Sequence, residues 1–400
     1  MQNLDSRAVY DVAVIGASVA GSTVATLLGR AGLDVLLCDK KNFPRNKPCG
    51  EGISSLGVRM LSELGITESS LSGREKNNYG LYRIWSKGKA FVLRAPSLRG
   101  VNTAMGVRRL LLDDKLLERA KSFPSVELLE GQGLKAVVDD GRYYVVTLDK
   151  QEIKAKYLVV ADGAYSHTAI KLGIPLQHGK LSRFGYSYYA KGKAKKVIDS
   201  VSVLLEPGLQ VFCTMTGTEE MTVSIVGNKN ALHQVFADEA LSVLHKEIEL
   251  CTGFAIEEYS APAGAGYVDQ ILRPPYRGRT FLVGDAVRRM DPAGGMGITH
   301  ALGCGFLCAS GLVEVLRRGR SCAEAGPEYE NRQIRFSDSL ARLTYINLLG
   351  LTCFTRYRFM LSLLRLSFLQ HLAEHVSRTI LSRAEAVLVQ AGAFSSSSRN

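Results

Sequence analysis

The chain has 400 residues, of which 46% are hydrophobic and 22% charged, with a formal net charge of +12. This composition is that of an ordinary globular protein, long enough for two domains or for one large domain with an insertion. The positive charge favours anionic partners such as dinucleotides, thioesters and membrane surfaces. Basic and aromatic residues are not interleaved on one face, which argues against nucleic-acid binding.

The eight cysteines are scattered, and none forms a C-x-x-C pair. This spacing argues against a zinc site and a disulfide framework, so we expect no metal and a reducing, cytoplasmic compartment. The N-terminus leads directly into a first strand, and we expect no signal peptide. Because no run of 18 apolar residues occurs, we also expect no membrane-spanning helix.

A strand, a tight turn, a helix and a second strand are predicted in this order between residues 9 and 40. Gly16 ends the first apolar run and makes the turn, and Gly21 allows the helix to pack closely on the strand. Asp39 ends the second strand, where a carboxylate can accept hydrogen bonds from ribose hydroxyls. The free N–H groups at the start of the helix favour a pyrophosphate. The pattern predicts a dinucleotide-binding βαβ unit, with an ordinary buried unit as the alternative.

One position departs from the G-x-G-x-x-G pattern, since Ser18 replaces its middle glycine. A Cβ there crowds a pyrophosphate, but the small hydroxyl side chain can donate to a phosphate. We therefore expect the turn, including Ser18 and Ala20, to bind a nucleotide.

The remaining segments predict an α/β protein with a second layer. After a Pro- and Gly-rich loop (40–54), the patterns indicate a short helix at 57–64, strands at 79–93, an amphipathic helix at 106–122, short strands at 126–149 and a buried strand at 156–163. Alternating runs between 184 and 227 predict an antiparallel sheet. The chain then continues with a predicted helix at 231–251, a strand at 280–285, a helix at 297–316 and helices from 329 to 389. A low-complexity tail ends it.

Three motifs occur together and in order: the turn with Asp39, the sequence ADG at 161–163 followed by Ser166, and GRTFLVGDAVRRMDPAGGMGITHA at 278–301. Together they resemble the FAD-dependent oxidoreductases of the p-hydroxybenzoate hydroxylase fold class. That class includes aromatic hydroxylases, flavin-dependent halogenases and geranylgeranyl reductases. The resemblance implies a Rossmann-like FAD-binding domain, an inserted antiparallel-sheet substrate domain and a helical C-terminus.

The resemblance also divides the chain. The FAD-binding parts are expected at 1–75, 101–175 and 276–325, the substrate domain at 76–100 and 176–275, and the C-terminal helices and tail at 326–400. The cofactor expected is FAD, with NAD(P)H as its reductant.

Each motif supplies candidate cofactor residues. Gly284 and Asp285 follow a buried strand, where the carboxylate can accept from a ribityl hydroxyl. The loop that opens the helix at 297 can point N–H groups at the pyrimidine edge of the flavin, where negative charge develops on reduction. The loop residues are Pro292, Gly294, Gly295, Met296, Gly297 and Ile298. Asp162 and Gly163 resemble the family's second acid motif, near the pyrophosphate; the alternative for both acids is turn chemistry at a strand end.

Basic residues complete the expected site. Arg109, four positions before Asp113, matches the family's arginine at a helix start that contacts the cofactor, and Arg108 is its neighbouring candidate; surface charge is the alternative. The family's arginine seven positions after the motif aspartate is replaced by Ala169, which argues against conventional NADPH docking.

The loop PRNKPCGEG resembles the geranylgeranyl reductase branch. The resemblance places Arg45 and Lys47 beside the adenosine phosphates, near Lys40, and places Cys49 and Gly50 near the flavin ring and the substrate. Cys49 is then a proton donor or a wall residue, with a buried small hydrophobe as the alternative. The single tryptophan, Trp85, does not provide the W-x-W-x-I-P motif of halogenases.

Two enzymatic activities and one non-catalytic role remain. Because hydroxylation is widespread in this fold class, we expect a monooxygenase that uses NAD(P)H and O₂ on a small aromatic or polyketide-like substrate. The alternative is a reductase of C=C bonds in an isoprenoid or lipid, favoured by the loop around Cys49. It is also favoured by apolar and arginine-rich residues 342–369, which could contact a membrane surface or form core helices. The non-catalytic role is that of a flavin-binding protein without turnover.

Overall fold

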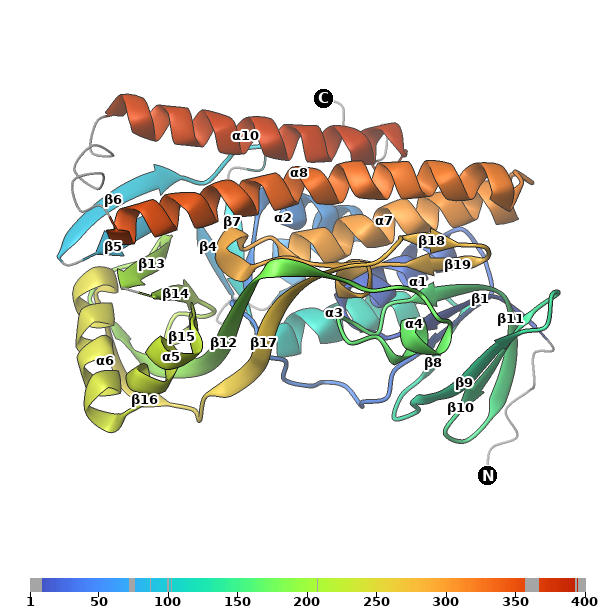
Figure 1. Cartoon of the computed structure of the whole chain (residues 1–400), viewed down its shortest axis with the longest axis horizontal. Coiled ribbons are helices and arrows are strands. Elements are labelled where there is room, and N and C mark those ends of the chain that lie inside the picture. Colours follow the sequence, from blue (N-terminus) through green and yellow to red (C-terminus); the bar gives the residue numbers. More distant parts are fainter. Residues whose placement is uncertain are drawn as a thin grey trace.

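The structure is a computed structural model that describes residues 9–394 except 72–75, 87, 99–100, 102, 207, 357–366 and 393. Three sheets and a layer of long helices make up this part of the chain (Figure 1). The predicted fold class is confirmed, because a Rossmann-like sheet, a mainly antiparallel sheet and a helical C-terminus are all present.

The first sheet has eight strands, and its centre is parallel. Its main path runs β18-β19-β11-β1-β2-β8, and β9 and β10 extend it as antiparallel strands. The strands are β1 (Tyr10–Ile15), β2 (Val35–Cys38), β8 (Val126–Leu129), β9 (Leu134–Asp139), β10 (Tyr144–Leu148), β11 (Glu152–Val160), β18 (Tyr276–Arg277) and β19 (Thr280–Leu282). The central strands are buried on both faces, which explains their unbroken apolar runs.

Helices α1 (Val19–Arg30), α3 (Arg109–Lys121) and α7 (Gly297–Leu316) belong to this region, and α1 contacts both of the others. The carboxyl ends of β1, β2 and β19 are followed by Gly16, Asp39 and the segment at 284, respectively. In an open parallel sheet, ligands bind outside these strand ends. The topology therefore brings the first and third sequence motifs to one edge.

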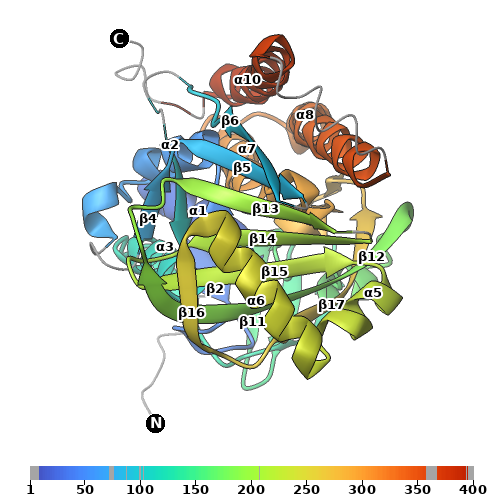
Figure 2. The same cartoon turned by 90° about the vertical axis from the view of Figure 1, so that its left-hand side faces the viewer.

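The second sheet has nine strands, in the order β20-β17-β12-β15-β14-β13-β5-β6, with β16 paired to β12. These strands are β5 (Leu81–Ser86), β6 (Lys89–Arg94), β12 (Gln177–Ala194), β13 (Ser200–Glu206), β14 (Leu209–Met215), β15 (Glu220–Gly227), β16 (Phe254–Tyr259), β17 (Ala263–Leu272) and β20 (Arg288–Arg289). Within the described part of this second sheet, only β5 and β13 pair in parallel. Figure 2 shows α6 (Asp238–Thr252) across one face of this sheet, with α5 (Lys229–Val235) beside it.

The smaller elements connect the two large sheets. A three-stranded sheet contains β3 (Gly52–Ile53), β4 (Lys76–Tyr79) and β7 (Ala104–Val107). Two short helices complete this part of the fold: α2 (Ser55–Glu63) follows β3, and α4 (His167–Lys171) follows β11. At the C-terminus α8 (Cys322–Arg356) packs on α7, and α10 (Ser367–Gln390) packs on α8 (Figure 1).

Several predicted boundaries were wrong. The helix expected at 106–122 begins at Arg109, because Gly106 and Val107 pair with β3 and β4 in the small sheet. The single helix expected at 231–251 is two helices, broken near Phe236. The strand expected at 280–285 ends at Leu282 and continues as a short 3₁₀ turn. Part of the helical region expected between 329 and 389 lies outside the described residues.

One described helix, α7, is long and apolar enough to cross a membrane, judged by length and composition only. Within the most apolar 18-residue window of α7, 72% is buried inside the protein. A buried core helix satisfies the same criteria, so α7 is weak support for a membrane span.

Candidate cofactor site and substrate cavity

The turn between β1 and α1 depends on glycine at two positions. Gly16 has φ +108°, and a Cβ on it would lie 2.5 Å from the carbonyl oxygen of Ala161. A Cβ on Gly21 would lie 1.8 Å from the carbonyl oxygen of Gly16. Neither position can take a side chain without moving backbone, so the turn and α1 stay close to the sheet. Ala20 is buried in the first turn of α1, beside Gly284.

Asp39 is buried and bound within its own loop. Its Oδ2 accepts from the N–H of Ala17 at 2.9 Å, and its Oδ1 accepts from the N–H of Lys41 at 2.9 Å. Arg45 lies 4.0 Å from Oδ2, whereas Lys40 is exposed. The carboxylate thus fixes the turn in this structure; its predicted contact with ribose hydroxyls stays a prediction.

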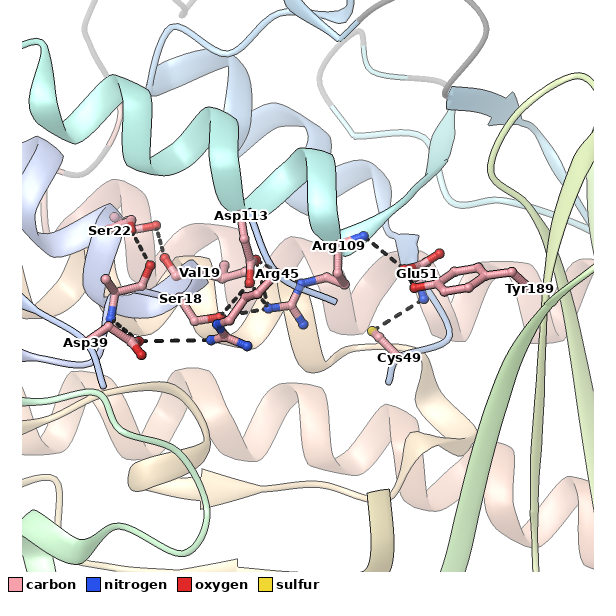
Figure 3. A network of polar contacts seen from close by, with 12 residues as sticks. Ser18, Val19, Ser22, Asp39, Arg45, Cys49, Glu51, Arg109, Asp113 and Tyr189 are labelled. Atoms are coloured by element: carbon pink, nitrogen blue, oxygen red, sulfur yellow. Dashed lines mark hydrogen bonds and ion pairs between the residues drawn. The ribbon is translucent and has the colours of Figure 1, made fainter. Parts of the chain in front are cut away.

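Arg109 connects Ser18 to α3. Its guanidinium donates to both oxygens of Asp113, at 2.9 and 2.8 Å, and to Oγ of Ser18 at 2.8 Å (Figure 3). The Ser18 hydroxyl in turn donates to Asp113 at 3.0 Å, rather than pointing freely into the turn. Burial lowers the pKa of Arg109, but Asp113 and Cys49 more than offset this, so the pKa is raised and the charge is permanent.

Lys47 and Asp285 extend this charged region. Lys47 is half-buried, and burial together with the charge of Arg109 lowers its pKa, against the opposing effect of Asp285 and Asp113. Gly284 begins the 3₁₀ turn after β19 with φ +59°. The structure therefore brings residues from the loop at 40–54, the first motif and the third motif to one place.

The second acid motif lies beside the same strand edge. Asp162 Oδ2 accepts from the N–H and the hydroxyl of Thr168, at 3.0 and 2.8 Å. Its Oδ1 is buried and finds no hydrogen-bond partner among the described residues. Gly163 has φ +90°, and a Cβ on it would meet no described atom within 4 Å. This oxygen and the open space next to it can receive a ligand.

The loop expected to face the flavin is anchored by an ion pair between Arg183 and Asp291, which was not predicted from the sequence. Arg183 on β12 donates to both oxygens of Asp291, at 2.9 Å each, and Asp291 accepts from the N–H of Ala293 at 2.9 Å. After these contacts come Pro292, Gly294, Gly295 and Met296, and then the first residues of α7, Gly297 and Ile298. Next to Gly295 and Gly297, a Cβ would meet nothing within 4 Å among the described residues, which leaves room for a planar ring. Asp291 lies within the third motif, directly before Pro292, and that position could have suggested its capping role.

Arg108 turns away from Asp113 and toward the substrate sheet. Its guanidinium carbon lies 3.9 Å from the centre of the Tyr189 ring, and its Nη1 lies 3.4 Å from Glu220. The two adjacent arginines therefore contact different parts of the protein: Arg109 contacts Ser18 in the turn after β1, and Arg108 contacts the second sheet. The sequence favoured Arg109 over Arg108 for the cofactor but did not predict the contact of Arg108 with the second sheet.

Cys49 and Gly50 lie where the two regions meet. The sulfur of Cys49 accepts from the N–H of Glu51 at 3.3 Å, and the carbonyl of Cys49 accepts from the hydroxyl of Ser224 at 3.3 Å. Glu51, which the sequence analysis did not select, is completely buried, and its carboxylate contacts α3 and two strands of the second sheet. Its two flanking glycines are the single local feature of the sequence at this position, and they do not reveal its burial, which tertiary packing decides.

A cavity of about 470 Å³ separates the loop at 292–298 from the second sheet. Its sheet side is mostly apolar, and residues of α8 and α10 line its far end. The apolar lining includes Ile84, Phe91, Leu93, Val203, Phe212, Leu343, Ile346 and Leu381. Cys49, Gly50 and Asp285 line the cofactor side. Such a cavity suits an apolar ligand larger than a single ring.

The residues present fit FAD. The buried Nε of Arg45 and Oδ1 of Asp162 have no partner among the described residues, and Arg109 donates to Ser18 at the N-terminus of the 12-residue helix α1. Arg45, Lys47 and Arg109 suit the pyrophosphate, Asp285 suits a ribityl hydroxyl, and the loop at 292–298 suits the pyrimidine edge. These individual contacts stay predictions.

Comparison with known proteins agrees with this geometry. A family model described as "FAD binding domain" matches residues 9–338. The chain belongs to this family. The resemblance to FAD-dependent oxidoreductases is therefore confirmed at the level of family and cofactor.

Several curated relatives of this FAD-binding protein are named as reductases. It is 37% identical over 167 residues to a menaquinone reductase of Mycobacterium tuberculosis, covering 41% of this chain and 40% of the relative. It is 26% identical over 338 residues to a digeranylgeranylglycerophospholipid reductase of Methanosarcina acetivorans, covering 81% and 80%. Conditioned medium factor receptor 1 of Dictyostelium discoideum is 25% identical over 342 residues, 78% of this chain and 65% of that protein. The chain thus spans less than two thirds of two of these three relatives.

Solved structures show the fold. The p-nitrophenol 4-monooxygenase PnpA of Pseudomonas putida DLL-E4 superposes with a TM-score of 0.75 at 15% identity, covering 96% of this chain and 98% of that one. The other similar structures include flavin-dependent halogenases and a monooxygenase.

Proposed function

We propose that the protein is a FAD-dependent reductase that saturates C=C bonds in an isoprenoid or similar lipid-like substrate. The observation that carries this proposal is the cavity of about 470 Å³, which is apolar on the sheet side and has a thiol next to the expected flavin position. The curated reductases to which the chain is similar support it. This changes our preference from the monooxygenase, which was expected from the fold class alone.

The chain itself would bind the alkene and deliver a proton. Bound FAD, once reduced, supplies a hydride; saturation of the bond then needs one proton on the other carbon. Cys49 lines the cavity and can donate the proton from Sγ. The guanidinium of Arg109, which lies near this sulfur, carries a permanent positive charge. The apolar wall excludes water from the reacting carbons.

The test follows the added hydrogen atoms. We expect the purified protein to be yellow, and, after anaerobic reduction with dithionite, to convert a geranylgeranyl lipid or an isoprenoid quinone to a product heavier by two hydrogens. In D₂O the product should carry solvent deuterium at a carbon. Cys49→Ser should retain FAD while turnover falls about 100-fold, or roughly 2.7 kcal/mol of barrier. A product that gains an oxygen atom from O₂, with full activity of Cys49→Ser, would reject the reductase.

That outcome would support the second candidate, a monooxygenase using NAD(P)H and O₂. It is favoured by the fold match over 96% of the chain to a monooxygenase. NAD(P)H as reductant is a proposal for either activity. The same assay, with NADH, NADPH or dithionite as the electron source, tests it.

We also propose that the far end of the cavity approaches a membrane surface. Large apolar side chains are exposed on α8 and α10, among them Tyr345, Leu349, Phe368 and Leu372. A lipid substrate would reach the cavity from this side, and the cytoplasmic location expected from the cysteines is compatible with it. Sedimentation with anionic vesicles tests the contact: we expect Phe368→Ser/Leu372→Ser to reduce binding, and equal binding by this variant and the parent would exclude it.

A further inference from the structure

Glu51 has an unusual backbone conformation for its residue type. Among the described residues it is the single non-glycine position with φ in the left-handed region, at +57°. This conformation is energetically unfavourable for a residue with a Cβ, whereas glycine adopts it freely. Such backbone strain persists only where surrounding contacts enforce it. Glycines flank it at positions 50 and 52. A glutamate at this strained position indicates that its side chain is needed.

The side chain is held by three donors from three different elements. Oε1 accepts from the N–H of Arg109 at 2.9 Å and from the hydroxyl of Tyr189 at 2.9 Å, while Oε2 accepts from the hydroxyl of Thr222 at 2.6 Å. Burial raises the pKa of Glu51, and these hydrogen bonds and the charge of Arg108 act in the opposite direction. The carboxylate thus joins the start of α3, which belongs to the nucleotide side, to β12 and β15 of the substrate sheet.

The backbone of Glu51 fixes the loop in both directions. Its N–H donates to the sulfur of Cys49 at 3.3 Å, and its carbonyl accepts from the N–H of Val107 at 3.1 Å. Figure 3 shows Cys49, Glu51 and Arg109 together, with the Tyr189 ring on the opposite side of the carboxylate. The position of the thiol therefore depends on contacts that cross between the two regions.

We infer that Glu51 is a positioning residue that holds the Cys49 thiol at the cavity wall by joining the FAD side to the substrate sheet. The thiol's role as proton donor rests on the proposed function, but its placement does not. Without the carboxylate, the strained loop loses all three of its side-chain anchors. The thiol then moves relative to the cavity while the nucleotide turn, which has its own contacts, stays intact.

The experiment compares Glu51→Ala, Glu51→Gln and Tyr189→Phe with the parent, each as the FAD-loaded full chain. The rate of Cys49 alkylation by iodoacetamide is read by peptide mass spectrometry, with the half-buried Cys322 as an internal control. Glu220→Gln is the matched control, because this carboxylate pairs with Arg108 and, in the described part of the chain, makes its hydrogen bonds to Arg108 and Thr216 rather than to the Cys49 loop.

For Glu51→Ala we expect alkylation of Cys49 to rise about 10-fold or more, because charge-assisted hydrogen bonds are lost. FAD affinity should change less than about 3-fold, since the turn keeps its own contacts. Glu51→Gln and Tyr189→Phe should show the same change to a smaller extent, and Cys322 and Glu220→Gln should not. In alkene reduction, kcat should fall with KM nearly constant.

Unchanged Cys49 alkylation in Glu51→Ala and Tyr189→Phe would overturn the inference, as would an equal change in Glu220→Gln. If Glu51→Ala does not fold, Tyr189→Phe and Thr222→Val decide by the same measurement. The alkylation assay needs no substrate. A rise in alkylation with no alkene reduction by the parent would therefore reject the proposed function and retain the positioning role.

Discussion

Two glycine-containing loops form the site, and they are held in different ways. The turn at 16–21 is fixed by backbone packing, since a Cβ on Gly16 or Gly21 would collide with a carbonyl oxygen. The loop at 48–54 is fixed instead by side-chain hydrogen bonds from α3, β12 and β15 to one buried carboxylate. The first loop therefore depends on close backbone packing, including the carbonyl of Ala161 after β11, and the second on hydrogen bonds from distant segments to one side chain. Substitutions should separate nucleotide binding from cavity geometry.

The largest expected effect is the loss of the first loop. Gly16→Val places a β-branched side chain at φ +108° against backbone, so we expect no FAD-loaded protein to be recovered. Gly297→Ala is the control, because its Cβ would meet no described atom within 4 Å: it should fold, and it reports whether the space is needed for the cofactor. Flavin absorbance of the purified proteins measures both, and FAD-loaded Gly16→Val would contradict our account of the turn.

The free energy of unfolding should depend on pH through the buried His300. Burial lowers the pKa of His300 to about 4 from an ordinary value of 6.5. The folded protein thus keeps a neutral ring where the unfolded chain binds a proton. Stability from this group is complete above pH 6.5 and is lost as the pH falls toward 4, by about 3 kcal/mol in total.

Urea unfolding at several pH values checks this, with His300→Gln and, as control, the exposed His375→Gln. The slope between pH 6.5 and 4 should flatten in His300→Gln alone. An unchanged slope in that variant would show that other groups cause the acid sensitivity.

A more moderate loss is expected for Asp285→Ala. Removing a charge-assisted hydrogen bond to a ribityl hydroxyl should cost about 1.5–3 kcal/mol, or roughly 10- to 150-fold in FAD affinity. The fold should survive, because Asp285 is only half-buried. FAD titration by fluorescence quenching measures the affinity, with Asp285→Asn retaining the size of the side chain. Parental affinity in Asp285→Ala would mean that the third motif has been misinterpreted.

The smallest effect on FAD affinity is expected from a substitution in the cavity wall. Val203 lies on β13 and lines the cavity, so Val203→Phe fills part of it. Because the added volume enters open space, we expect a stability change below about 1 kcal/mol, less than for overpacking a filled core. FAD affinity should be unchanged, while longer alkenes should lose turnover relative to shorter ones. Equal losses for both chain lengths would show that this wall does not select the substrate.

The sequence predicted the nucleotide side well. The family, the FAD cofactor and the fold class followed from three ordered motifs, and each motif depends on local requirements. A tight turn needs glycine at Gly16, and a buried parallel strand needs a continuous apolar run. Boundaries were less accurate: β7 took residues assigned to the next helix, because pairing with β3 and β4 outweighed local helical preference.

The cavity side was decided only by the tertiary structure. The sequence favoured Arg109 as the cofactor arginine and named Arg108 as its neighbouring candidate, but only the structure shows that Arg108 stacks on Tyr189 while Arg109 binds Asp113. It could not select Glu51, since its three donors lie 58, 138 and 171 positions away. Local patterns encode turns and strands because their forces act between near neighbours. A buried carboxylate is stable only where distant donors meet it, and the packing of the two sheets determines where that is.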